Sequence, residues 1–62
     1  NFSTYLNEFR VQKARQLMTD TRLNLKDISA ACGYSDANYF TKVFKRITGK
    51  TPSEYRLENL NN

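Results

Sequence analysis

The sequence predicts an all-α domain, and three observations support this. The 62 residues include only one proline and two glycines, Pro52, Gly33 and Gly49, so few positions interrupt a helix. No segment shows the alternation of β-branched and polar residues that marks a half-buried strand. Apolar residues recur instead at spacings of three and four. We therefore expect one small domain whose helices are separated near these three residues, since so short a chain supports a single core.

The first predicted helix covers residues 3–20, with Ser3 as its N-cap candidate. Its apolar face changes sides near Arg10. At 100° per residue, the apolar side chains before Arg10 project between about 140° and 240°; they are Phe2, Tyr5, Leu6 and Phe9. Those after it project between about 260° and 20°; they are Val11, Ala14, Leu17 and Met18.

Two interpretations of this change of face stay open. In the first, a bent helix carries a drifting apolar seam. In the second, the helix joins two cores, and its first half packs on something outside this chain. A weak internal similarity favours the second: Ser3 and Tyr5 have the same spacing as Ser53 and Tyr55, 50 residues later.

Residues 24–49 are predicted to form two further helices joined by a short turn. Asn24 is an N-cap candidate with Asp27 three positions later, and Gly33 ends the helix that they begin. Its apolar residues are Leu25, Ile28, Ala31 and Cys32. The next helix covers about residues 36–48, is capped by Ser35 and ends at Gly49. Its predicted core face is Phe40, Val43, Phe44 and Ile47.

The last predicted helix covers residues 51–60. Pro52 is suited to its first position, and Glu54 is placed to complete a capping box with Thr51. We expect the end of this helix to fray among Asn59, Asn61 and Asn62.

Composition excludes several classes of function. The chain has 10 Lys and Arg against 6 Asp and Glu, which gives a net charge of +4 and favours an acidic partner. It has no His and a single cysteine, Cys32, so a disulfide framework, a zinc finger and a histidine base are excluded. We expect no enzyme activity, metal or cofactor, and Cys32 is expected in the core. No apolar run approaches the roughly 18 residues that span a bilayer, so the chain is expected to be intracellular.

The spacing of the second and third helices is typical of a helix-turn-helix of the homeodomain-like type, in a domain of three to four helices. An ordinary αα-hairpin is the alternative. The outward face of residues 36–48 favours the first interpretation. No acid occurs in residues 37–53, which hold four of the basic residues. A solvated face would usually mix charges of both signs, whereas DNA phosphates would balance this one.

The side chains on that face suit a major groove. The predicted base contacts are Ala37, Asn38, Thr41 and Lys42, and the predicted backbone contacts are Ser35, Tyr39, Lys45, Arg46 and Lys50. The first helix carries a second basic cluster of Arg10, Lys13 and Arg15, which we interpret as a solvated face rather than a contact.

Four segments carry a family resemblance: Ile28–Ser35, Tyr39-Phe40, Phe44-Lys45 and Gly49–Arg56. Together with Tyr5-Leu6, Arg10 and residues 14–17 they resemble the AraC/XylS family of bacterial transcription regulators. Ser29 departs from the pattern, since an alanine is usual there. The resemblance implies a domain of two helix-turn-helix units joined by a long linker helix. This chain would hold the linker and the second unit, so the first unit is expected to be absent.

The resemblance also implies sequence-specific binding of double-stranded DNA by a cytoplasmic, nucleoid-associated bacterial regulator, and a sensing or receiver domain in the full-length chain. The alternative is a protein-interaction module that docks an acidic partner such as RNA polymerase. The exposed aromatic half of the first helix predicts either self-association through Phe2, Tyr5, Leu6 and Phe9 or fraying of the helix start.

Overall fold

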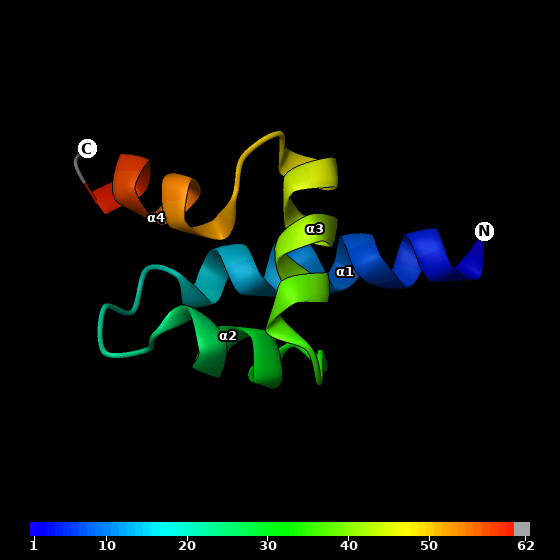
Figure 1. The fold of residues 1–62 in the computed structure, drawn as a ribbon, viewed down its shortest axis with the longest axis horizontal. Coiled ribbons are helices and arrows are strands. Elements are labelled where there is room, and N and C mark those ends of the chain that lie inside the picture. The colour runs from blue at the N-terminus through cyan, green and yellow to red at the C-terminus, as the bar shows by residue number, and fades with distance from the viewer. Residues whose placement is uncertain (61–62) are drawn as a thin grey trace.

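Figure 1 shows the computed structural model, which describes residues 1–60 as four helices and no strand. They are α1 (Phe2–Leu17), α2 (Leu25–Ala31), α3 (Ala37–Thr48) and α4 (Pro52–Leu60). Helix α1 lies along the long axis of a molecule of 35 × 20 × 18 Å, α3 crosses it, and α2 and α4 lie on opposite sides of α1 in this view. The predicted all-α class is confirmed. Asn61 and Asn62, for which fraying was expected, lie outside the described residues.

Two predicted capping boxes are confirmed. At α2, the Asp27 backbone N–H donates to Asn24 Oδ1 at 2.8 Å, and the Asn24 backbone N–H donates to Asp27 Oδ2 at 3.4 Å. At α4, the Glu54 backbone N–H donates to Thr51 Oγ1 at 3.2 Å, and the Thr51 backbone N–H donates to Glu54 Oε1 at 2.9 Å. These bonds satisfy N–H groups that the first turn of a helix otherwise leaves without partners.

The other two predicted N-caps are wrong. Helix α1 is capped by Asn1, whose Oδ1 accepts from the Thr4 N–H at 2.9 Å, so Ser3 lies inside the first turn. Helix α3 is capped by Asp36, whose Oδ1 accepts from the Asn38 N–H at 2.9 Å. In both places a carboxamide or carboxylate one or two positions from the serine supplies an equally good acceptor, so local preference alone does not choose between them.

Two helix ends also differ from the prediction. Helix α1 ends at Leu17, with Met18 as its C-cap, and Thr19 Oγ1 donates back to the Gln16 carbonyl at 2.8 Å. Residues 18 and 19 therefore form a turn, and residues 18–20 do not extend the helix. Asn59 was expected to fray, but it lies within α4 and its Nδ2 donates to the Tyr55 carbonyl at 2.8 Å.

The core lies where α1, α2 and α3 meet, and α4 covers one end of it. A chain of aromatic rings runs through it, with centroids 5.3 Å apart for Tyr34 and Phe40, 5.7 Å for Phe40 and Phe44, and 5.4 Å for Phe44 and Tyr55. The other buried apolar side chains are Val11, Ala14, Met18, Ile28, Cys32 and Val43. The second half of α1 thus packs on the following helices, as its apolar face predicts.

Two residues assigned to the core from sequence are exposed instead. Ala31 projects about 60° from Ile28, away from Leu25 and Cys32, so it faces solvent while Ser29 is buried. Ile47 lies on the apolar face of α3 but is 38% exposed. It lies in the last turn of α3.

Candidate nucleic-acid interface

The turn between α2 and α3 closes with two hydrogen bonds that define a Schellman motif. The Gly33 N–H donates to the Ala30 carbonyl, and the Tyr34 N–H donates to the Ser29 carbonyl, each at 3.0 Å. Gly33 has φ of +97°, a left-handed conformation in which any Cβ is strained, so the predicted need for glycine here is confirmed. Tyr34 is buried directly after it and closes the turn as an apolar plug.

Helix α3 has two distinct faces. Phe40, Val43 and Phe44 are buried, whereas the four predicted base-contacting side chains are exposed; these are Ala37, Asn38, Thr41 and Lys42. Ala37 and Asn38 lie in the first turn, and Thr41 and Lys42 follow one turn later. The structure therefore brings these four side chains together on one outward surface, which spans the first half of the helix.

Local hydrogen bonds of Thr41 and Asn38 leave groups of both side chains available for contacts with a DNA base. Thr41 Oγ1 donates to the Ala37 carbonyl at 2.9 Å, so its hydroxyl proton is engaged and its methyl group is left for a thymine methyl or an apolar base edge. The Asn38 backbone N–H is satisfied by Asp36, and its side-chain amide is free to extend outward. Such an amide can pair with the N6 and N7 atoms of adenine.

The five predicted backbone contacts are also exposed: Ser35, Tyr39, Lys45, Arg46 and Lys50. Lys45 and Arg46 lie in the last turn of α3, where positive side chains also complement the helix dipole. Tyr39 is half-exposed, and its ring lies 5.9 Å from that of Tyr34. It lies in the first turn of α3, directly after Asn38.

Two acidic side chains of α4, Glu54 and Glu58, reduce the positive charge at the C-terminal end of α3. The sequence alone does not indicate this arrangement. Lys50 forms an exposed ion pair with Glu58 of α4, eight positions later. Hydrogen bonds from the backbone and hydroxyl of Thr51 hold the pKa of Glu54 below its ordinary value, with a smaller contribution from Lys45 and Lys50. The run 37–53 is free of acids in sequence, but the folded surface at the C-terminal end of α3 is not.

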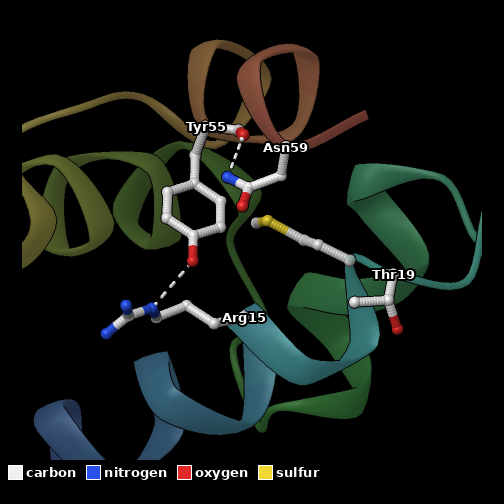
Figure 2. Close-up of a pocket in the computed structure, with 5 residues that line it drawn as sticks. Arg15, Thr19, Tyr55 and Asn59 are labelled. Atoms are coloured by element: carbon white, nitrogen blue, oxygen red, sulfur yellow. Dashed lines mark hydrogen bonds between the residues drawn. The ribbon is translucent and has the colours of Figure 1, made fainter. Parts of the chain in front are cut away.

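The basic residues of α1 have structural contacts of their own. The Arg10 guanidinium lies over the Tyr34 ring, 5.2 Å from its centroid. Arg15 lies over the Tyr55 ring, and its Nε donates to the Tyr55 hydroxyl at 3.0 Å. Figure 2 shows this bond at a pocket between the end of α1 and α4, lined by Arg15, Met18, Thr19, Tyr55 and Asn59. Arg10 and Arg15 thus join α1 to the rest of the fold. This supports the interpretation that they do not contact DNA.

The first half of α1 leaves its aromatic face uncovered. Phe2 is 76% exposed, Tyr5 67% and Phe9 63%, while Leu6 is partly buried. The change of apolar face predicted near Arg10 is therefore present in the structure. In the structure the helix begins at Phe2, and association through this face and fraying of the helix start both stay predictions.

One residue that matters here was missed from the sequence. Asn7 is only 8% exposed, and its Oδ1 accepts a hydrogen bond from the Tyr34 hydroxyl at 2.8 Å. Asn7 projects at about 340°, on the same face as Val11, Ala14 and Met18. The helical angle of Asn7 therefore indicates that it faces the core. A prediction that considers only apolar residues overlooks it because its side chain is polar.

The described residues offer no group of three or more His, Cys, Asp or Glu side chains that could hold a metal ion. Within the same part of the chain, no helix is long and apolar enough to cross a bilayer. Cys32 is buried in the core, and burial raises the pKa of its thiol while nearby Lys13 and Arg10 partly oppose that change. The thiol is therefore neutral and packs as a small apolar group.

Comparison with known proteins connects this geometry to a family. A family model described as a helix-turn-helix domain matches residues 1–58. The chain is 50% identical over 52 residues to the HTH-type transcriptional activator RhaR of Escherichia coli strain K12, and equally to RhaR of Shigella flexneri serotype 5b. Each match covers 84% of this chain and 18% of the relative, so the chain spans less than a fifth of these relatives. No solved structure matches the chain.

Proposed function

The chain belongs to the AraC-type family of helix-turn-helix transcription regulators, and on that premise we propose that it reads a DNA sequence by inserting α3 into the major groove. DNA binding as part of a transcription regulator is the function of this family. The proposal adds which helix enters the groove and which side chains contact bases and phosphates.

The observation that carries the proposal is the division of α3 into a buried aromatic face and an exposed polar face. The exposed face begins at the N-terminal end of the helix, which is the end that a recognition helix directs toward base edges. Asn38 would pair with adenine, and Lys42, one turn later, would reach O6 or N7 of guanine. Ala37 and the Thr41 methyl group would lie against thymine methyls.

A second group of side chains would hold the helix in register on the phosphate backbone. Ser35 and Tyr39 lie beside the N-terminal end of α3, while Lys45 and Arg46 lie toward its C-terminal end. Lys50 would contribute less than its charge suggests, because Glu58 already neutralises it.

We extend the proposal to the protein of which these residues form the DNA-binding part. A second helix-turn-helix unit would cover the aromatic face of α1, and a sensing or receiver domain would supply the signal; isolated chains would associate through the same face. Its relatives are named transcriptional activators, so activation is the expected output, on the nucleoid of a bacterial cytoplasm. No contact in the described residues favours RNA polymerase as the ligand of α3.

The test compares two duplexes, one selected from a randomised pool for binding to this chain and one scrambled. Asn38→Ala and Lys42→Ala should each weaken binding to the selected duplex by about 1 to 3 kcal/mol, while Asn38→Ala changes binding to the scrambled duplex much less. Lys13→Ala, an exposed lysine on α1, is the matched control and should leave the preference unchanged. Equal losses on both duplexes for Asn38→Ala would refute direct readout.

Salt dependence tests the phosphate contacts separately. Neutralisation of three to four phosphates gives a slope of log K against log salt of roughly −3 to −4. Binding that does not change with salt would exclude the proposed backbone contacts. For the aromatic face, sedimentation at several concentrations should show association that Tyr5→Ser and Phe9→Ser abolish, and a monomer at every concentration would contradict this.

A further inference from the structure

Tyr34 stands at the junction of three helices. Its backbone N–H closes the C-terminal end of α2 by donating to the Ser29 carbonyl. Its ring packs against the first turn of α3, 5.9 Å from the Tyr39 ring and 5.3 Å from the Phe40 ring. Its hydroxyl donates to Asn7 of α1 at 2.8 Å in a buried setting. One side chain thus connects the linker helix, the turn and the start of the recognition helix.

The Asn7–Tyr34 bond is directional, unlike the apolar packing around it. Both side chains are nearly fully buried, so their polar atoms depend on partners inside the fold for hydrogen bonds, and the Tyr34 hydroxyl donates its proton to Asn7. Only a narrow range of distances and angles satisfies the pair, whereas the apolar contacts of Val11 and Ala14 have no preferred direction. The bond therefore fixes the position of Tyr34 along α1.

Arg10, one turn after Asn7, supports the same residue from the other side of the turn. Its guanidinium lies 5.2 Å from the Tyr34 ring centroid. It also covers Gly33, because a Cβ built on that glycine would lie 3.3 Å from Arg10 Cζ. Neither of the salt bridges within the described residues involves Arg10, so it is held here by the aromatic ring and the turn rather than by a carboxylate.

We propose that Asn7 is a positioning residue for DNA recognition, which acts through the Tyr34 hydroxyl to set the angle at which α3 presents Asn38 and Lys42. This inference rests on the proposed function of α3. Base readout needs side chains placed within a fraction of an ångström. Without the Asn7–Tyr34 bond, α3 could change its angle relative to α1 while the rest of the core stays folded. Binding to phosphates, which adapts to small shifts, depends less on this anchor.

The variants are chosen to separate positioning from stability. Tyr34→Phe removes only the hydroxyl but leaves the Asn7 amide buried without its partner. The double variant Asn7→Leu/Tyr34→Phe removes both polar groups while keeping similar volumes, an exchange that can be nearly neutral for stability. Gln12→Leu makes a comparable polar-to-apolar change at an exposed position of α1 and serves as the control. Circular dichroism sets a temperature at which each protein is folded.

The readout is the ratio of affinities for the selected and scrambled duplexes, measured by fluorescence anisotropy. The double variant should lose about five-fold or more of this ratio, mostly through weaker binding to the selected duplex, and Gln12→Leu should lose none. Should the double variant fail to fold, Tyr34→Phe at low temperature gives the same comparison and the same expected loss. A wild-type ratio in the folded variants overturns the positioning role, whereas no preference in the wild-type protein overturns the proposed function instead.

Discussion

Replacement of Ser29 by alanine should stabilise this protein. Ser29 is only 2% exposed, on the face of α2 that packs into the core. Its Oγ is buried and has no hydrogen-bond partner among the described residues. A buried hydroxyl that loses its water without gaining another partner destabilises the folded state. Its backbone carbonyl accepts from the Tyr34 N–H, and alanine keeps that bond.

Three contributions set the magnitude of the change in unfolding free energy. Relief of the unsatisfied hydroxyl contributes about 1 to 3 kcal/mol. The higher helix propensity of alanine adds up to about 0.7 kcal/mol. The small void left by one oxygen atom offsets less than about 1 kcal/mol, which is the value for a methyl-sized cavity. These contributions sum to a net gain of about 0 to 4 kcal/mol, with a midpoint near 2 kcal/mol. Each kcal/mol raises Tm by roughly 4 to 8 °C in a domain of this size.

Urea and thermal unfolding followed by circular dichroism measure this change. Ser3→Ala, an exposed serine within α1, is the matched control, and its effect should stay within about 0.5 kcal/mol. A loss of stability in Ser29→Ala would refute the reasoning, because it would mean that the hydroxyl has a partner or that its volume is needed. The AraC-type pattern, in which alanine is usual at this position, agrees with the expected direction.

Three further predictions concern the core, the pH dependence and the charged surface. Phe44→Ala, at a fully buried position, should lower the unfolding free energy by about 3 to 5 kcal/mol, and a urea midpoint near the wild-type value would contradict the central place given to this ring. Burial raises the pKa of the Cys32 thiol and that of the Tyr34 hydroxyl above their ordinary values, so the unfolded chain loses these protons first. The stability that the two neutral groups contribute is complete below about pH 9 and declines as the pH rises through their pKa values in the folded protein. The urea midpoint should therefore fall between about pH 7 and 11. A constant midpoint would exclude this linkage. Glu58→Gln removes the ion pair with Lys50. Binding to a scrambled duplex should then strengthen a few-fold at low salt and lose that gain at high salt. Unchanged binding would mean that Lys50 lies away from the phosphates.

Features that depend on neighbours within one turn of helix could be predicted from the sequence. The capping boxes at Asn24 and Thr51 link residues three positions apart, so the sequence already contains both partners. The left-handed conformations at Gly33 and Gly49 follow because other residues are strained there. Where two capping residues stand side by side, as at Ser35 and Asp36, the same local rule does not decide between them.

The outward face of α3 was also predictable, because helical spacing alone places Asn38, Thr41 and Lys42 opposite Phe40 and Phe44. The charge around it was not. Whether a lysine is free depends on acids that the fold brings from elsewhere.

The helices, most of their ends and the two faces of α3 can thus be predicted from the residues alone, since they follow from interactions across three or four positions. The burial of Asn7 against Tyr34, 27 positions away, and the pairing of Lys50 with Glu58 become visible only in the folded chain. The same holds for the Ser29 hydroxyl, which has no partner within residues 1–60. Burial and charge pairing depend on distances in space, and helical periodicity does not specify these distances.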